Sequence, residues 1–474
     1  MRAIWACIAL AGMAQVALYA ATGGGERPST AIDADSCVTA ECHVAQTAHR
    51  VLHGPVNVHD CQACHEPVDV REHSFRLTHE PTALCASCHE MDLPEEHRVH
   101  EPVETGECAS CHDPHGGPDR RFLKPNAFGD ACLSCHDELS LRDQRFVHGP
   151  VAAGECSGCH EPHSSPRQYL LRDSGSEMCL SCHQQMGRQM FAASVVHEPA
   201  AEDCTSCHDP HASNFPMMAR APTAELCTEG CHDAIGTQIF TSTVTHSAAY
   251  EDDACSNCHS PHATNRTALL KARPVDLCMS CHEHPIERDD QPAIASVAML
   301  VQPGLHQHGP VEEGSCEGCH DVHGTDIRSL LVAAYPQGHY EPFDTESYGL
   351  CFSCHDAQMV QEPRLEGLTR FRDGDVNLHY VHVNQAKRGR TCRNCHDAHA
   401  APLERIMHET VAYGPSAWEL PIRFERTETG GSCSPGCHQP LAYDRLEPVL
   451  DHEDPASLAD RSDDPDSDAD PSSP

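Results

Sequence analysis

Pairs of cysteines followed directly by histidine recur along this chain of 474 residues. Twelve pairs have the spacing C-x-x-C-H: Cys61 and Cys64 before His65, Cys85 and Cys88 before His89, Cys108 and Cys111 before His112, Cys132 and Cys135 before His136, Cys156 and Cys159 before His160, Cys179 and Cys182 before His183, Cys204 and Cys207 before His208, Cys255 and Cys258 before His259, Cys278 and Cys281 before His282, Cys316 and Cys319 before His320, Cys351 and Cys354 before His355, and Cys392 and Cys395 before His396. Three pairs are wider: Cys37 and Cys42 before His43, Cys227 and Cys231 before His232, and Cys433 and Cys437 before His438. We number these motifs 1 to 15 in chain order.

This residue pattern suits covalent haem attachment, in which two thiols form thioethers with the porphyrin vinyl groups and the adjacent histidine binds the iron. Disulfides would not require the histidine, and zinc sites built from paired C-x-x-C units would leave it without a role. The sequence therefore predicts about fifteen haems c. The three wide motifs fit the same class if their extra residues bulge out.

The even-numbered motifs carry two further kinds of histidine that are suited to the second axial position. One kind lies 11 to 14 residues before the motif histidine: His53, His100, His148, His197, His246, His308 and His382. The other lies three residues after it: His115, His163, His211, His262, His323 and His399. Motif 2 has Val68 at that place, and His73 is the nearest replacement.

These fourteen histidines leave one ligand to find for fifteen irons. The candidates are His49, His59, His79, His97, His284, His306, His339, His379, His408 and His452, of which we favour His79. The two ligands of one iron approach from opposite faces, so the histidine three residues after a motif is expected to serve a neighbouring haem. Unliganded surface histidines are the alternative interpretation, and the 12 methionines show no fixed spacing from the motifs.

The odd-numbered motifs have no histidine three residues on and mostly have an apolar residue before the first cysteine. Motif histidines recur every 22 to 27 residues up to His282 and every 35 to 42 residues afterwards. We therefore expect a tightly spaced haem array over 23–283 and a wider-spaced region over 284–450.

The composition also bears on the fold. The hydrophobic fraction is 39%, and this figure includes 31 cysteines, so side chains alone provide little core for so long a chain. We expect a mostly irregular fold with short α-helices and few or no strands, held together by haems. The formal charge of −39 excludes nucleic acid as a partner and favours partners with a cationic patch, or a metal cation as substrate.

The two ends differ from the repeat. Residues 1–22 have the features of a secretory signal peptide, with an uncleaved membrane anchor as the alternative. Residues 451–474 are rich in Asp, Ser and Pro and predict a disordered acidic tail.

The strings Gly106-Glu107-Cys108 to His115 and their repeats resemble multihaem cytochromes with doubled C-x-x-C-H motifs. The resemblance covers about residues 37–438. Over these residues the chain is similar to the decahaem periplasmic cytochromes that sit inside outer-membrane porins. The resemblance implies that the protein is an electron carrier located in the periplasm, at the outer membrane or outside the cell. It also implies redox proteins, an outer-membrane porin and a surface cytochrome as partners. Two alternatives stay open: a multihaem reductase or oxidase of a small nitrogen or sulfur species, and an extracellular filament subunit formed by self-association.

Overall fold

The computed structural model describes residues 37–38, 42–91, 93–124, 130–136, 141–251, 253–288, 291–413, 418–436 and 438–449. The predicted signal peptide, the predicted acidic tail and Cys437 lie outside these residues. The chain forms two compact units: Met1–Asp143 with Val147–Ser174, and Gln144–Phe146 with Gly175–Pro474. The boundary that motif spacing predicts near residue 283 falls inside the second unit and stays a prediction.

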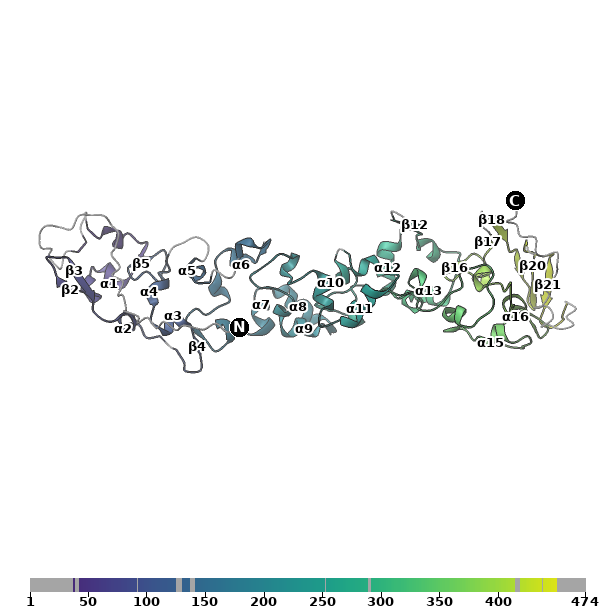
Figure 1. Cartoon of the computed structure of the whole chain (residues 1–474), viewed down its shortest axis with the longest axis horizontal. Helices are drawn as coiled ribbons and strands as arrows, with labels where there is room; N and C mark the ends of the chain where they lie inside the picture. Colours follow the sequence, from purple (N-terminus) through teal and green to yellow (C-terminus); the bar gives the residue numbers. More distant parts are fainter. Residues whose placement is uncertain are drawn as a thin grey trace, which may run out of the picture. The chain divides into compact units, whose positions relative to one another are not determined.

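The first unit contains helices of four to six residues and short strands (Figure 1). The helices are α1 (Gly54–Asn57), α2 (Pro81–Ala86), α3 (Glu101–Glu104), α4 (Cys108–Cys111), α5 (Asp130–Leu133) and α6 (Gly149–Ala152). The strands are β1 (Val51–Leu52), β2 (His65–Asp69), β3 (Ser74–Leu77), β4 (Arg98–Val99), β5 (Gly116–Gly117) and β7 (Ser164–Ser165), and β6 (Phe146–Val147) spans the change from one unit to the other.

The second unit continues the same pattern and adds a more regular sheet near its end (Figure 1). Its helices are α7 (Gly175–Leu180), α8 (Gln184–Ala192), α9 (Glu198–Glu202), α10 (Thr223–Thr228), α11 (Asp233–Thr241), α12 (Pro274–His282), α13 (Gly309–Glu313), α14 (Gly349–Phe352), α15 (Gln358–Gln361) and α16 (Leu378–Val383). Its strands are β8 (Val195–Val196), β9 (Ala212–Ser213), β10 (Ala263–Thr264), β11 (Ile286–Arg288), β12 (Gln291–Ile294), β13 (His306–Gln307), β14 (Arg372–Asp373), β15 (Val376–Asn377), β16 (Ala400–Ala401), β17 (Thr410–Tyr413), β18 (Trp418–Pro421), β19 (Phe424–Arg426), β20 (Gly430–Cys433) and β21 (Leu441–Asp444).

The two kinds of motif have different local structures. In motifs 3, 5, 7, 9, 11 and 13 the first cysteine lies in a short α-helix, namely α2, α5, α7, α10, α12 and α14, whereas Cys433 of motif 15 lies in strand β20. The first cysteine of an even motif mostly begins or lies in a 3₁₀ turn, such as Cys156–Gly158 or Cys316–Gly318. Helices this short are marginal by themselves, so other bonds must hold them in place.

Two-residue antiparallel strand pairs join successive even motifs. β1 pairs with β5, β4 with β7, β8 with β10, and β13 with β16. In each pair one strand directly precedes an upstream histidine, and the other follows the +3 histidine of the next even motif. The short helices, small strand pairs and abundant irregular structure confirm the predicted fold class.

Buried apolar side chains are concentrated towards the C-terminal end of the second unit. Of sixteen buried apolar residues in the described chain, twelve lie between Leu331 and Tyr443. Tyr348, Val360 and Val383 form one cluster. A second cluster of Val376, Leu378 and Tyr443 packs against Phe371. In the described ranges no helix is both long enough and apolar enough to cross a membrane.

Candidate functional site

Each even motif from motif 4 onwards closes a loop that fixes its own histidine. The motif histidine forms a β-bridge to the residue eleven positions later, as in His112 with Leu123 and His320 with Leu331. Its Nδ1 lies within hydrogen-bonding distance of the carbonyl oxygen nine residues on: Arg121 (2.6 Å), Tyr169 (2.7 Å), Met217 (2.9 Å), Ala268 (2.6 Å), Ser329 (2.9 Å) and Arg405 (2.9 Å). When Nδ1 carries the proton that this bond requires, Nε2 is the nitrogen left to bind a metal.

The carbonyl that takes this bond belongs to a strained residue in five loops. Tyr169, Met217, Ala268, Ser329 and Arg405 all have left-handed backbones, with φ between 52° and 63°. A non-glycine residue in this conformation costs roughly 1–2 kcal/mol. Such strain persists only where the surroundings enforce it, and its repetition at one position indicates that the loop orients the carbonyl towards the histidine.

In four of these six loops a serine or threonine stands five residues after the motif histidine, and the sequence interpretation missed it. Ser165 is 1% exposed, donates to the Leu171 carbonyl (2.6 Å) and accepts from the Arg167 N–H (3.0 Å). Thr325 makes the equivalent bonds to Leu331 and Ile327. The signal was available, because Ser165, Ser213, Thr264 and Thr325 all stand five residues after their motif histidine.

Five of the upstream histidines lie at the N-cap of a short helix. His53, His100, His148, His197 and His308 each directly precede the first residue of the helix, and the second residue of that helix is a proline. The Nδ1 atoms of His53, His100, His197 and His308 lie 2.9–3.0 Å from the carbonyls of Pro114, Pro162, Pro261 and Ala398. The H-x-P string is therefore a second local signal that the sequence interpretation left unused.

Upstream histidines face the motif histidine of the following odd motif. Ring centres are 5.8 Å apart for His53 and His89, 6.1 Å for His100 and His136, 6.2 Å for His197 and His232, 6.3 Å for His246 and His282, and 6.0 Å for His308 and His355. The ring planes lie within 8–22° of each other. The upstream histidine thus reaches the next motif rather than its own.

The +3 histidines face the motif histidine of the preceding even motif. The separations are 6.4 Å for His115 and His65, 6.0 Å for His163 and His112, 6.0 Å for His262 and His208, 6.3 Å for His323 and His259, and 6.2 Å for His399 and His320. In four units an aspartate two residues before the +3 histidine accepts its main-chain N–H: Asp113, Asp209, Asp321 and Asp397. Each of these +3 rings therefore lies opposite the motif histidine of a neighbouring motif, and its role as a distal ligand stays a prediction.

The spacing of these eleven ring pairs, counting His43 with His73, fits two axial ligands on one iron. Metal–imidazole bonds of roughly 2.0–2.1 Å, with roughly 1.1 Å from nitrogen to ring centre, place the centres of two opposed ligands roughly 6.2 Å apart. A tetrahedral ion would bring the two centres to roughly 5 Å by the same bond lengths. The observed 5.7–6.4 Å matches the linear arrangement.

Burial keeps several of these imidazoles neutral. Burial first and the facing imidazole second lower the pKa values of His65, His163, His246 and His262. A neutral ring is the form that binds a metal. Burial and then the nearby imidazole of His396 lower the pKa of His379 to about 3.

The cysteines of consecutive motifs lie side by side. Burial and then Cys156 raise the pKa of the Cys132 thiol to about 11, and burial and then Cys316 raise that of Cys278 to about 12. Burial and the adjacent Cys108 also raise the pKa of Cys85. The attachment points of neighbouring motifs are therefore in contact.

Motif 9 shows how a wide pair is accommodated. The His232 N–H donates to the carbonyl of Cys227 five residues back, whereas His89 bonds Cys85 four residues back. The extra residue is absorbed at Gly230, whose φ is +83°. Because His232 still faces His197 at 6.2 Å, the bulge that we expected leaves its histidine in the regular position.

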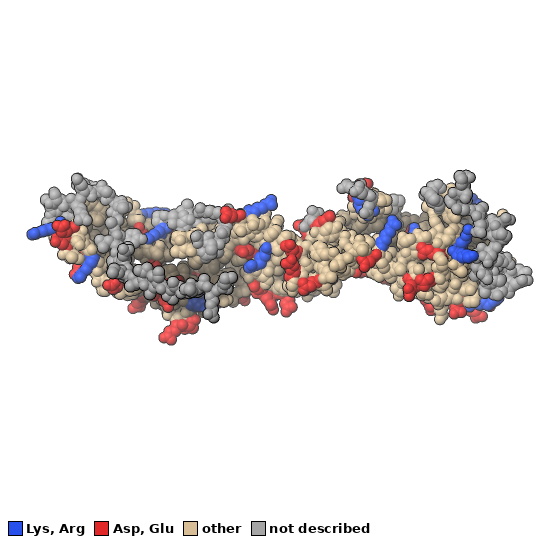
Figure 2. All heavy atoms as spheres, viewed as in Figure 1, with Lys and Arg blue, Asp and Glu red and all other residues tan. Residues whose placement is uncertain are grey.

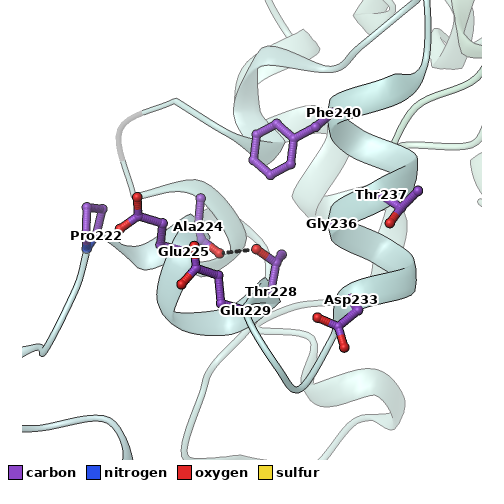
Figure 3. Close-up of a pocket in the computed structure, with 9 residues that line it drawn as sticks. All are labelled: Pro222, Ala224, Glu225, Thr228, Glu229, Asp233, Gly236, Thr237 and Phe240. Atoms are coloured by element: carbon purple, nitrogen blue, oxygen red, sulfur yellow. Dashed lines mark hydrogen bonds between the residues drawn. The ribbon is translucent and has the colours of Figure 1, made fainter. Parts of the chain in front are cut away.

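A cavity of about 500 Å³ lies between α10, which contains Cys227 of motif 9, and α11, which begins directly after His232 (Figure 3). Glu225, Glu229, Asp233 and Phe240 line it. Thr228 also lines it and donates to the Ala224 carbonyl (2.8 Å). Gly236 allows the two helices to approach, since a Cβ there would lie 2.7 Å from that of Thr228.

Some predicted ligands are placed differently or not paired. His73 faces His43, with centres 5.7 Å apart and planes at 66°, so it lies at motif 1 rather than motif 2. His79 contacts its neighbour Thr78 through Nδ1 (3.2 Å), and the described residues bring no motif histidine to its ring. The partners expected for His160 and His183 belong to the other compact unit, and those pairings stay predictions.

One comparison with known proteins identifies a family. The family model of the doubled CXXCH motif matches residues 53–93, 100–141, 148–188, 197–237, 246–286 and 308–360, which together make up more than half of the chain. Each match begins at an upstream histidine and spans one even motif with the odd motif that follows. Motifs 1, 14 and 15 lie outside the matches. No curated protein matches the chain.

Proposed function

Since the chain belongs to the doubled CXXCH family of multihaem c-type cytochromes, we propose that it is an electron conduit with fifteen haems c, each held by two histidines. The twelve matched motifs carry the family's haem-binding signature. The remaining three have the same cysteine–histidine chemistry, and motif 1 also has the facing ring pair of His43 and His73.

The paired imidazoles are the observation that carries this proposal. Each pair provides two opposed nitrogen donors at the spacing that an iron between them requires. Bound haem supplies a one-electron couple, whose potential falls when both axial ligands are histidine. With both axial positions taken by side chains, no position is left for a substrate, which favours a carrier over an enzyme.

Two features of the chain keep successive sites close. The cysteine contacts between motifs 3 and 4, 5 and 6, and 11 and 12 place their attachment points together. The two-residue strand pairs fix successive even motifs to each other. The upstream histidines add hydrogen bonds to carbonyls of the next even motif, so the proposed ligands of different haems are connected through the backbone. A conduit needs many sites at short intervals, and this arrangement repeats along the chain.

We place this conduit between the periplasm and the outer membrane or cell exterior, in anaerobic or metal respiration. The predicted signal peptide and the resemblance to porin-inserted cytochromes support that location, with an outer-membrane porin and a surface cytochrome as candidate partners. Carboxylates are spread over the face shown in Figure 2, in keeping with 71 acidic against 32 basic residues. A redox partner with a cationic patch suits this surface.

Low-temperature electron paramagnetic resonance of the oxidised holoprotein tests the proposal. We expect low-spin ferric signals from all sites. A substantial high-spin signal would instead favour the reductase or oxidase alternative, which needs an iron with an open face. Electron microscopy separates the remaining alternative, because polymers would indicate a filament subunit and discrete particles a single conduit.

A further inference from the structure

The residue directly after each even motif from motif 4 onwards stands two positions before the +3 histidine. From motif 4 to motif 14 this residue is Asp113, Glu161, Asp209, Ser260, Asp321 and Asp397. In five units the ring of that +3 histidine faces the motif histidine of the preceding even motif. A side chain at this place is therefore a neighbour of the proposed distal ligand of a haem that belongs to another motif.

Three of these aspartates hold a carboxylate beside the ring of their own +3 histidine. The distances from Oδ1 to the histidine Nδ1 are 3.2 Å for Asp113 and His115, 3.9 Å for Asp321 and His323, and 3.8 Å for Asp397 and His399. The same Oδ1 atom accepts the main-chain N–H of the histidine at 2.7–3.1 Å, so the backbone fixes the position of the charge. These carboxylates are only 26–36% exposed, so water screens their charge incompletely.

Asp321 is held at both of its oxygens. Its Oδ2 accepts a hydrogen bond from Nε2 of Gln238 on α11 (2.7 Å). The ring of His323 faces His259, with centres 6.3 Å apart and planes at 18°. Since Nδ1 is the nitrogen near the carboxylate, Nε2 is the one that remains for an iron between the two rings. A carboxylate on the Nδ1 side makes an imidazole a more basic ligand, which favours ferric over ferrous iron.

Ser260 interrupts the series of acidic residues. Its hydroxyl donates to the Ala263 carbonyl within the same loop (3.2 Å), and a serine brings no charge to this place. His262 nevertheless faces His208 with centres 6.0 Å apart and planes at 13°. The ring pair at motif 8 therefore has nearly the same geometry as the ring pair at motif 10, without the carboxylate.

Glu161 is acidic, but its charge is balanced by a neighbouring cation. Its Oε1 lies 2.9 Å from Nε of Arg172, and Arg172 also donates to the Ser157 carbonyl (2.7 Å). The ring of His163 faces His112 of motif 4. The imidazole pair at motif 4 thus has an ion pair near its distal ring in place of a single carboxylate.

We propose that the residue directly after an even motif tunes the reduction potential of the haem at the preceding even motif. Asp113, Asp321 and Asp397 lower the potentials of the haems at motifs 2, 10 and 12. The haem at motif 8 has the highest potential of these four, because Ser260 is neutral. This inference rests on the proposed function, and it gives the conduit a step in potential between motifs 8 and 10.

Spectroelectrochemical titration of the full-length holoprotein tests the effect of removing the charge. Asp321→Asn keeps an oxygen that can accept the His323 N–H but has no charge, so we expect one haem component to shift to higher potential. The shifted component should be absent when Cys255 and Cys258 are also replaced by alanine, because that change removes the haem of motif 10. An unshifted titration, or a shift that survives the loss of this haem, would overturn the proposal.

The reverse substitution adds the charge where the chain lacks it. Ser260→Asp should move one component to lower potential, and this component should be the one that is lost when Cys204 and Cys207 are replaced by alanine. No shift, or a shift to higher potential, would overturn the proposal. If Asp321→Asn does not accumulate with all its haems, the result for Ser260→Asp decides alone.

Two further variants separate the charge from other effects. Asp344 also caps a main-chain N–H, that of Glu346 (3.3 Å), and Asp344→Asn should leave every component unshifted. A shift in Asp344→Asn equal to that in Asp321→Asn would defeat the assignment. So would a shift that occurs in Asp321→Ala and not in Asp321→Asn, because the aspartate would then act only by holding the backbone. The proposed function is judged separately on the wild type, where a high-spin signal counts against the saturated conduit whatever the variants show.

Discussion

The main-chain N–H of His100 donates to the main-chain carbonyl of His163 (2.9 Å), although the two imidazoles face different motifs. The ring of His100 faces His136 of motif 5, and that of His163 faces His112 of motif 4. The same bond joins His53 to His115, His197 to His262 and His308 to His399. Two axial sites therefore share each backbone bridge, so a disturbance of one site is mechanically coupled to the other.

Replacing His163 with Met should change the haem at Cys108 and Cys111, because the ring of His163 faces His112. We expect one His–Met haem with a raised potential, seen as one altered component in a spectroelectrochemical titration. The matched control removes the site: the change should disappear when Cys108 and Cys111 are also alanine. If the change disappears instead when Cys156 and Cys159 are replaced, the neighbour pairing is wrong.

Haem loading should follow the number of motifs rather than the number of family matches. The intact mass of the mature holoprotein should exceed that of the polypeptide by fifteen haems, because motifs 1, 14 and 15 have the same chemistry as the twelve matched motifs. The variant Cys433→Ala with Cys437→Ala should lose the mass of one haem. A wild-type mass with only twelve haems would restrict attachment to the matched segments.

Gly230→Ala should weaken motif 9. The backbone at Gly230 has φ +83°, where a side chain costs roughly 1–2 kcal/mol. We expect a lower thermal unfolding temperature and a fraction of molecules lacking one haem by mass. Gly158→Ala is the control, since that motif glycine has no atom within 4 Å of an added Cβ. Equal effects of the two substitutions would contradict the bulge.

Ser165→Ala should loosen the loop that orients His160. The hydroxyl is buried and bonds both Leu171 and Arg167, so its loss leaves polar groups unsatisfied at a cost of about 1–3 kcal/mol. Thermal unfolding measures this loss. The control Thr105→Ala removes an exposed hydroxyl that bonds the Glu101 carbonyl, and it should cost less. A neutral Ser165→Ala would show that the loop does not depend on this anchor.

Tyr348→Phe should stabilise the C-terminal core or leave it unchanged. Tyr348 is 0% exposed, and within the described chain its hydroxyl oxygen has no hydrogen-bond partner. Removing an unsatisfied buried hydroxyl relieves a penalty of about 1–3 kcal/mol. Tyr348→Ala should cost about 3–5 kcal/mol through the cavity it leaves, as for other large aromatic truncations. Thermal melts compare the two, and a large loss in Tyr348→Phe would reveal a bond to the hydroxyl.

The sequence alone determined the chemistry of the sites, because thioether attachment and proximal ligation depend on residues next to each other in the chain. The spacing between Cys108 and His112 is local, and so is the alternation of motifs with and without a +3 histidine. The same local logic predicted short helices and little core. The order of residues along the chain does not determine, however, which distant histidine faces which motif.

Only the tertiary structure decided that pairing. His399 faces His320, and His308 faces His355, because backbone bridges such as β13 with β16 bring separate segments into one register. Whether a histidine can lie opposite another ligand depends on distances between side chains in the folded protein. The spacing of residues in the sequence limits those distances only within a single loop.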